Sequence, residues 1–434
     1  MVLHRLTVSA VLLAGLLSAA CTGDDAVAEE EPESSTAAPA PTTTSSTQPP
    51  VAAPLVVSPE VLASLPGRLV VATDEGTIDI IDPNGEQRRA VADEANTLLS
   101  QPTWAPGSQR LSWTSITAAG PSVRVHNLTD DTTTAIPTGT PVFYHSWNAA
   151  GDQVATLRSS GGGPIQLDVH DADAGTTREI ALGQPFYLDW ADEGDRVVLA
   201  VNATSVARLD LDDASGANLQ LPAPVGVFQS PAVLADESFL ISLAAPNGFE
   251  LVQVDSDDTI RRIARLDGAI SMATSPDSSR VAVLVSPDPS APQLEQASFQ
   301  TLEELPDGLV SIVDLATGDV DTLPHPNVVA INWSPDGSWL AALQVDAAGS
   351  RWLFTRDAVT TRGPNHEPTP TMLQQYLPFA DQYNQSHRWW SPDSRAFVFA
   401  GSVAGEDGIW IDVVDDDVDP AKIAEGSVAF WSPN

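Results

Sequence analysis

Short apolar runs, each followed by a tight turn, recur along most of the chain. The clearest example is VVAINWSPDGSWLAALQV, residues 328–345, in which two runs rich in Val, Ile and Leu flank Ser334-Pro335-Asp336-Gly337. This pattern predicts a β-hairpin, because Ser, Pro, Asp and Gly are the residues that tight turns use. Related hairpins begin near residues 102, 144, 187, 232, 271 and 387, and the chain ends on VAFWSPN.

Two further strands are predicted after each hairpin. A third apolar run ends at an aspartate, as in LVSIVDLATGD (309–319) and IQLDVHDADAG (165–175), and a short run such as VDTLP or TREIAL follows it. The unit repeats about every 43 residues, and helical periodicity is nearly absent. A repeat of this length with four short strands is typical of a β-propeller blade. We therefore predict an all-β fold.

The two ends of the repeat region supply complementary parts of one blade. Residues 67–91, GRLVVATDEGTIDIIDPNGEQRRAV, predict a second, third and fourth strand, whereas the final SVAFWSPN predicts only a first strand. We expect the C-terminal strand to pair with these N-terminal strands, because closing the ring removes exposed sheet edges. Seven whole repeats and this composite predict eight four-stranded blades, with seven as the alternative.

The Trp-Ser-Pro-Asp hairpins resemble a known repeat. NWSPDGSWLAAL, WWSPDSRAFVF and TSPDSSRVAVL, each followed by an Asp-terminated strand, are similar to the TolB-type propeller repeat. The resemblance covers residues 67 to 434, although WAPGS, WNAAG and WADEG keep the tryptophan and lose Ser-Pro-Asp. It implies a β-propeller like those of exported binding proteins of the bacterial envelope, and it is specific for architecture rather than for function.

The N-terminal segment predicts export. Residues 1–20 combine an early arginine with an apolar stretch too short to span a bilayer, as in a signal peptide. Leu17-Ser18-Ala19-Ala20-Cys21 resembles a bacterial lipobox, and Cys21 is the single cysteine of the chain. The resemblance implies lipidation at Cys21, which would anchor the chain on the outer face of the cytoplasmic membrane, at the cell surface or in the periplasm. The alternative is an ordinary signal peptide with an incidental cysteine.

The rest of the chain divides into a tether and a body. Residues 21–55 are dominated by Thr, Ser, Pro, Ala and acidic residues, a composition that predicts a disordered tether. Residues 56–434 form the predicted propeller domain. The chain carries 58 acidic and 20 basic residues, with Lys422 as its only lysine. A surface this negative argues against nucleic acid and against docking on anionic lipid, since both are polyanions.

Catalytic and cofactor motifs are not found. The nearest match to a nucleophile elbow, Gly401-Ser402-Val403-Ala404-Gly405, has its serine misplaced, and there is no P-loop, dinucleotide fingerprint or His-Glu-x-x-His. We therefore expect no catalytic residue, metal or cofactor. The histidines of the body, which have no metal-ligand spacing, are His126, His145, His170, His325, His366 and His387.

Two acidic clusters, residues 412–419 and 208–216, follow third strands. Calcium binding would need several oxygen ligands that converge on one point, whereas aspartates in turns commonly accept hydrogen bonds from their own backbone. We favour the turn interpretation, because no EF-hand or nonapeptide calcium pattern is present.

Aromatic residues recur just ahead of the repeat tryptophans. Phe143-Tyr144 and Phe186-Tyr187 occupy equivalent places, and His387 takes the place of Tyr144 in a later repeat. Because first strands line the axis of a propeller, Tyr144, Tyr187 and His387 are candidate binding residues at one channel mouth. The alternative is that they pack between blades.

Two insertions interrupt the regular spacing. Residues 286–308 separate a second from a third strand, and residues 363–386 separate a fourth strand from the next first strand. Because strand direction alternates, we expect both on one face, where they would form a partner-binding cap that can be deleted without loss of folding. The alternative is that the second insertion packs down over a blade edge. Its candidate binding residues are Tyr376, Phe379 and Tyr383.

The sequence thus predicts a non-catalytic envelope lipoprotein. Its propeller would bind an envelope protein, a peptide or a glycan through the face that carries the insertions, and we expect a monomer. The alternative function is an exported hydrolase or lactonase with its site at the channel mouth.

Overall fold

The computed structural model describes residues 56–94, 97–161, 163–184, 186–191, 195–202, 204–211, 216–226, 230–286, 299–415 and 418–434. Leu55–Asn434 form one compact unit, distinct from Met1–Pro54. The predicted signal peptide, Cys21 and the predicted tether lie outside the described residues, as do residues 287–298 of the first insertion.

The described chain is almost entirely β-structure, in repeated antiparallel sheets. Five sheets each consist of four strands that are consecutive in sequence. These are β4–β7 (Leu98–Trp104, Arg110–Thr117, Gly120–Asn127, Thr132–Pro137), β8–β11 (Val142–Trp147, Gln153–Ser159, Ile165–Asp171, Thr177–Gly183), β12–β15 (Phe186–Trp190, Arg196–Val201, Ser205–Asp210, Gly216–Asn218), β16–β19 (Ala232–Val233, Phe239–Ala245, Gly248–Val254, Ile260–Leu266) and β20–β23 (Ala269–Thr274, Arg280–Ser286, Leu309–Asp314, Val320–Thr322).

Two further sheets depart from this plan. A four-stranded sheet joins β32 (Val428–Trp431) to β1 (Leu69–Ala72), β2 (Thr77–Ile81) and β3 (Arg89–Asp93). An eight-stranded sheet contains β24 (Val328–Trp333), β25 (Leu340–Asp346), β26 (Gly349–Arg356), β27 (Val359–Arg362), β28 (His366–Pro368), β29 (Ala396–Val403), β30 (Glu406–Val413) and β31 (Ala421–Ala424). In this sheet β28 bridges β26 and β29.

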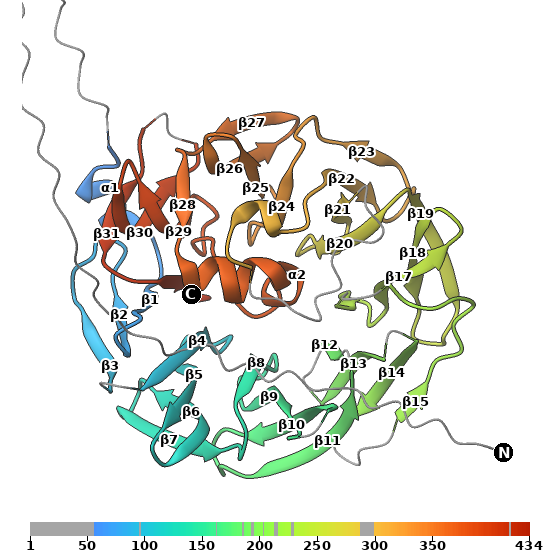
Figure 1. The fold of residues 1–434 in the computed structure, drawn as a ribbon, viewed down its shortest axis with the longest axis horizontal. Helices are drawn as coiled ribbons and strands as arrows, with labels where there is room; N and C mark the ends of the chain where they lie inside the picture. Colours follow the sequence, from blue (N-terminus) through green and yellow to red (C-terminus); the bar gives the residue numbers. More distant parts are fainter. Residues whose placement is uncertain are drawn as a thin grey trace, which may run out of the picture. The chain divides into compact units, whose positions relative to one another are not determined.

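The sheets are arranged around a common centre, with the first strand of each innermost and the fourth at the periphery (Figure 1). This arrangement and the four-stranded repeat are consistent with the predicted propeller. Short helical segments occur at α1 (Pro59–Ser64), η2 (Leu302–Glu304), η3 (Met372–Tyr376), η4 (Leu377–Phe379) and α2 (Ala380–Tyr383). Within the part of the chain that the structure describes, no helix has the length and apolarity needed to span a membrane.

The Ser-Pro-Asp turn is stabilised by its own side chains. Asp336 Oδ1 accepts hydrogen bonds from Ser334 Oγ at 2.6 Å and from Ser338 N at 2.9 Å, while Ser334 Oγ accepts from Trp339 N at 2.9 Å. Gly337 adopts φ +69°, a left-handed conformation in which glycine meets no steric penalty. These local bonds explain why the same residues recur at each hairpin.

Arginines join many neighbouring sheets at the level of these turns. Arg110 Nη1 donates to Gly151 O at 3.1 Å, and Arg280 Nη2 donates to Gly337 O at 2.7 Å. Arg356 pairs with Asp415 at 2.9 Å. Arg110 and Arg280 contact the next sheet along the chain, whereas Arg356 and Asp415 both belong to the eight-stranded sheet, on β26 and just after β30.

Large aromatic side chains pack between the β26 and β29 regions of the eight-stranded sheet. Trp352 and Phe397 have ring centroids 4.7 Å apart, and Phe354 packs edge-on against Trp390 at 5.6 Å. Burial of such side chains, each on the order of 2 kcal/mol or more, is the main stabilising term.

Candidate functional site

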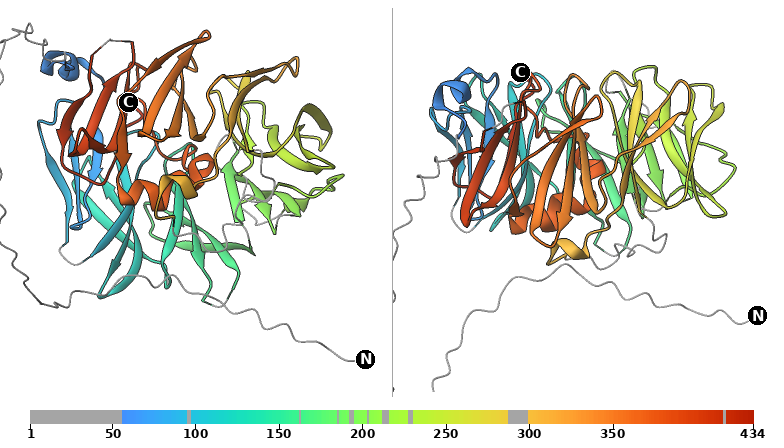
Figure 2. Two further views of the ribbon diagram at one scale, coloured as in Figure 1. Left: turned by 45° about the horizontal axis from the view of Figure 1, so that its top comes forward. Right: turned by 90° about the horizontal axis from the view of Figure 1, so that it is seen from above.

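The second insertion lies at the centre of the sheets. Residues 371–387, here called the central plug, contain η3, η4 and α2 and lie across the innermost strands (Figures 1 and 2). Its buried side chains are those of Met372, Leu373, Tyr376, Leu377, Ala380, Gln382, Tyr383 and His387. The predicted helical spacing is confirmed, but the segment lies over the centre rather than over a blade edge.

Polar side chains of the plug bond to the inner strands of several sheets. Gln382 Nε2 donates to Leu188 O at 2.9 Å, and its Oε1 accepts from Leu188 N at 3.4 Å. Asn384 Nδ2 donates to Ile331 O at 2.6 Å, and Gln385 Nε2 donates to Pro231 O at 2.8 Å. We therefore expect deletion of residues 363–386 to impair folding, contrary to the prediction from sequence, because the plug contributes buried side chains to the core.

Four of the predicted binding residues form one aromatic cluster. Tyr383 packs against Tyr144 at 5.5 Å and against Tyr376 at 4.7 Å, and His387 lies 5.1 Å from the Tyr383 ring. Phe430, at 4.5 Å from His387, completes the cluster. Phe430 has no functional signal in the sequence beyond its place in the predicted C-terminal strand.

This cluster is buried rather than exposed at a channel mouth. Tyr144, Tyr376, Tyr383 and His387 are each less than 5% exposed. Burial raises the pKa of Tyr144 to about 12, and its hydroxyl donates to Gln382 O at 3.2 Å. These buried contacts agree with the alternative interpretation, in which the residues pack inside the protein. The residues pack against the plug as well as between sheets.

The two remaining candidates lie beside the cluster. Tyr187 on β12 is buried, and its pKa is raised well above the usual value by burial and by the charge of Asp381. Phe379 is half-buried and packs against the main hydrophobic core.

Two histidines near the plug are held neutral by burial. His387 is bracketed by hydroxyls, with Ser386 Oγ 2.8 Å from Nδ1 and Thr103 Oγ1 3.1 Å from Nε2. His145 Nε2 lies 2.9 Å from Ser112 Oγ. Burial lowers the pKa of His387 well below its usual value and that of His145 to about 3. Both imidazoles therefore serve as neutral hydrogen-bonding partners near pH 7.

Two buried carboxyl groups, one beside the plug and one within it, have pKa values raised above the usual value. Asp189 on β12 accepts hydrogen bonds from Val233 N at 2.8 Å and from Trp190 N at 2.9 Å, and Asp381 accepts from Ser230 N at 3.4 Å. Burial raises the pKa of Asp189 to about 7 and that of Asp381 to about 6. Neither pairs with a basic side chain among the described residues, so their ionised forms are disfavoured.

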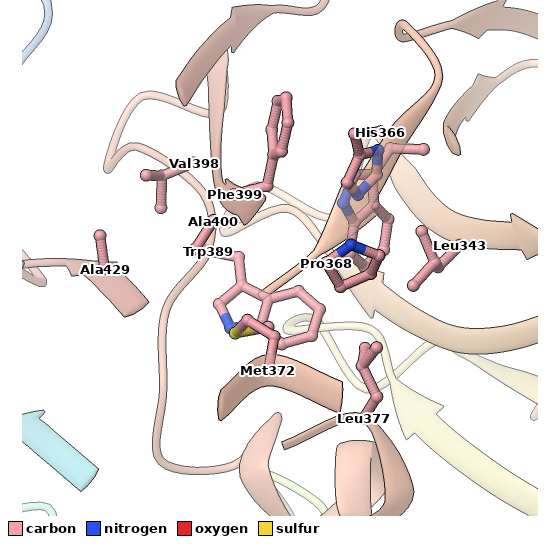
Figure 3. A pocket seen from close by; sticks show the side chains of 11 residues that line it. Leu343, His366, Pro368, Met372, Leu377, Trp389, Val398, Phe399, Ala400 and Ala429 are labelled. Carbon is pink, nitrogen blue, oxygen red and sulfur yellow. The ribbon is translucent and has the colours of Figure 1, made fainter. Parts of the chain in front are cut away.

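A small apolar cavity lies between the plug and the eight-stranded sheet (Figure 3). Its walls include Met372, Leu377, Trp389, His366 and Phe399. The free volume is about 10 Å³, which is near the minimum needed for one water molecule. It is a packing gap rather than a ligand pocket.

Aspartates that end third strands can accept hydrogen bonds from their own turns. Asp314, which lies outside the two predicted acidic clusters, accepts at Oδ1 from Ala316 N at 2.9 Å and from Thr317 N at 2.8 Å. Of the two acidic clusters, residues 212–215 and 416–417 lie outside the described residues. Among the residues that are described, no three His, Cys, Asp or Glu side chains are grouped so that they could hold a metal ion.

The insertions share one face of the unit. Strand direction alternates, so the plug and the described end of the first insertion, with η2, emerge on the face opposite to the Ser-Pro-Asp turns, and Figure 2 shows α1 and the C-terminus on the turn side. We call these the plug face and the turn face. Val56, where the described chain begins, bridges Asp419 on the turn face.

Comparisons with known proteins concern the architecture. No protein-family model matches the chain, and no curated protein matches it. Among solved structures, dihydro-heme d1 dehydrogenase NirN in complex with DHE is similar at 13% identity over 87% of this chain and 82% of its own, with a TM-score of 0.56. Oligogalacturonate lyase in complex with manganese is similar at 11% identity over 81% and 98%, with a TM-score of 0.52.

TolB from Acinetobacter baumannii is also a neighbour, at 16% identity over 62% of this chain and 66% of its own, with a TM-score of 0.37. At such identities a likeness concerns the fold alone. The structural neighbours thus include TolB proteins.

Proposed function

We propose that this chain is an exported, lipid-tethered propeller that binds a protein, peptide or glycan partner of the envelope through its plug face. The observation that carries the proposal is the placement of both insertions on that face, opposite to the point where the described chain begins. Loops on a rigid scaffold are common binding elements.

We infer eight blades for this scaffold. The eight-stranded sheet divides into β24–β27 and β29–β31, and the segment 387–390 supplies the inner strand of the second part through the Trp390–Phe397 bridge. With the six four-stranded sheets, this gives eight. The pairing of β32 with β1 would then close the ring, as Leu69 opposite Trp431 supports.

The proposal predicts a specific requirement for the first insertion. Phe299 and Leu305 are buried and must be kept, so we would replace residues 288–297 with a Gly-Ser linker of equal length. The expected result is an unchanged melting temperature together with loss of partner capture from envelope extracts of the native host. As a control, the linker would replace residues 316–318 in the turn after β22. Equal capture by the wild type and the 288–297 variant would contradict the proposal.

Lipidation at Cys21 is a separate part of the proposal. Mass spectrometry of the mature chain should show a diacylglycerol-modified N-terminal cysteine, and Cys21→Ala should release the chain from membranes. An unmodified mature N-terminus elsewhere would reject the anchor and leave the binding proposal standing.

The alternative is an exported hydrolase or lactonase. Its site would lie at the channel mouth, near His387 and His145, both of which are buried in this structure. Metal analysis of the purified chain and an activity screen that includes His387→Ala and His145→Ala test it. Turnover that these variants abolish without unfolding would favour the enzyme over the binding protein.

A further inference from the structure

Charge is distributed unevenly between the two faces. The formal net charge is −38, and the turns on the turn face carry aspartates such as Asp130, Asp314 and Asp336. By contrast, four segments of sheets β4–β7 and β8–β11 that reach the plug face contain no Asp, Glu, Lys or Arg. These segments, residues 97–100, 114–122, 137–143 and 181–184, are here called the uncharged sector. The charged residue Arg158 on β9 lies opposite Val142 and is paired with Asp168 at 2.5 Å.

Large apolar side chains are exposed in this sector. Leu98 is 50% exposed, Ile116 37%, Phe143 44% and Leu182 57%. They are four of the eight exposed large apolar side chains among the described residues. In so acidic a chain, a region that combines apolar exposure with the absence of charge is typical of a docking surface.

The sector is continuous along the edge of the two sheets. Leu98 lies opposite Ile116 in the β4–β5 pair. Thr138 N donates to Pro121 O at 3.2 Å, which joins the second and third segments, and Gln101 Nε2 donates to Phe143 O at 2.5 Å, which joins the inner strands. Phe143 is therefore the centre of the sector.

The plug supports this centre from the inner side. Tyr383 Oη donates to Phe143 O at 3.3 Å, while the neighbouring Tyr144 packs against the Tyr383 ring. Phe143 lies at a register shift between Val142 and Tyr144, so Tyr144 is buried while Phe143 is 44% exposed. A rigid backbone under an exposed aromatic ring is favourable for binding, because little side-chain entropy is lost on contact.

Acidic residues border the sector on one side. The adjacent sheet, β1–β3 with β32, presents exposed Asp74, Glu75 and Asp93 at the plug face. Asp74 Oδ1 accepts a hydrogen bond from Thr371 Oγ1 at 3.0 Å, so this carboxylate lies beside the plug. No basic side chain pairs with Asp74 or Glu75 among the described residues, which leaves their charge available to a partner.

We propose that the uncharged sector docks a protein partner whose contact patch is apolar and uncharged and is flanked by Lys or Arg facing Asp74 and Glu75. The inference rests on the proposed function and specifies the part of the plug face that binds. Charge complementarity at the border would set orientation and association rate, while Phe143 and its apolar neighbours would supply affinity. A second copy of this chain fits less well, because its border is also acidic.

Site-specific photo-crosslinking in the native host tests the location. A photoreactive amino acid would replace Phe143 or Ile116 in the full-length chain, with Asp407 as a site elsewhere on the plug face and Val359 as an exposed site on the turn face. The expected result is a shared adduct from positions 143 and 116 and none from 359. Adducts from position 407 alone would overturn the proposal that the uncharged sector docks the partner, and would leave the proposed function standing. Absence of adducts at all four sites would overturn both the docking proposal and the proposed function.

The composition of the crosslinked peptide shows whether the partner has the predicted chemistry. Support requires that the crosslinked peptide be apolar with nearby Lys or Arg, since capture alone is not sufficient. A peptide from this chain itself, or one rich in acidic residues, would overturn the proposal.

Matched variants then separate the apolar contribution of Phe143 from the charge contribution of Asp74 and Glu75. Phe143→Asp should reduce the adduct at position 116 at least tenfold, whereas Val359→Asp should leave it unchanged. Asp74→Lys with Glu75→Lys should reduce it severalfold at low salt and little at 0.5 M salt, because screening removes the border attraction. Equal effects of Phe143→Asp and Val359→Asp, or a border effect that is independent of salt, would contradict the assignment. Unchanged melting temperatures establish that each variant is folded.

Discussion

Trp104 Nε1 donates a hydrogen bond to the carbonyl oxygen of Phe430 at 3.2 Å, across 326 positions of sequence. Trp147 Nε1 makes the equivalent bond to Thr103 O at 3.2 Å, and Trp333 Nε1 makes it to Ala273 O at 2.9 Å. In each case the indole donates to a backbone carbonyl of the preceding sheet. The acceptor residue comes just before the position that corresponds to the tryptophan in that sheet, as Thr103 comes just before Trp104. Each of these three tryptophans thus links its sheet to the preceding one through a hydrogen bond.

Trp104→Phe should lower the free energy of unfolding by about 1–3 kcal/mol. The substitution leaves the buried Phe430 carbonyl without its donor and removes part of the indole. Urea unfolding followed by circular dichroism measures the change. As a control, Trp410→Phe removes a bond of similar length to Gly401 within one sheet pair. A Trp104 variant as stable as the wild type would show that this bond contributes nothing.

Removal of residues 428–434 should prevent stable folding. It deletes β32, including Phe430 and Trp431, which are at most 1% exposed, and leaves the edge of β1 unpaired. The lost burial is on the order of 10 kcal/mol, comparable to the whole stability of a typical domain. Thermal unfolding and limited proteolysis measure it, with removal of residues 433–434 alone as the control. A truncated chain that melts like the intact one would refute the role of this strand.

Gln382→Ala should destabilise the unit by about 1–3 kcal/mol and expose the plug to proteases. The variant leaves the N–H of Leu188 without its side-chain partner in a buried site and removes one of the two side-chain donors to the Leu188 carbonyl, the other being Ser230 Oγ at 3.4 Å. Gln374→Ala, at an exposed position of the same plug, should change stability by less than about 0.5 kcal/mol. If the two variants behave alike, the plug is not anchored through Gln382.

Asp189→Asn should stabilise the protein at pH 8 and have little effect at pH 4. The pKa of Asp189, raised to about 7 by burial, means that between pH 4 and 7 the folded state holds a proton that the unfolded state releases. The free energy of unfolding therefore falls as pH rises through this window, by at most about 1.4 kcal/mol per unit, and is level above it. Asparagine removes this dependence.

The pH measurement compares the variant with the wild type at each pH. Burial lowers the pKa of His145 to about 3 and that of His170 to about 4, so these groups reduce stability as pH falls below about 6.5. The difference between variant and wild type cancels their contribution. A difference that does not vary between pH 4 and 8 would contradict the shifted pKa of Asp189.

The repeat itself could be predicted from sequence because its causes are local. Ser334, Asp336 and Gly337 form their turn with bonds and a φ angle that involve only neighbouring residues. The four-stranded unit and the shared face of the two insertions follow from these local facts.

The position of the plug could not be predicted in this way. The spacing of Met372, Tyr376 and Tyr383 indicated an apolar helical segment, but it was equally compatible with a blade edge and with the centre. The choice depends on partners far away in sequence, such as Leu188 and Phe430, which only the assembled sheets bring together.

The sequence alone therefore determined the repeating hairpins, their turns and the acidic surface, since each depends on residues close together in the chain. Only the tertiary structure decided that the second insertion fills the centre, that Tyr144 and His387 are buried beneath it, and that Phe143 stays exposed in an uncharged sector. The physical reason is that burial is a property of the space between sheets, to which distant residues contribute together.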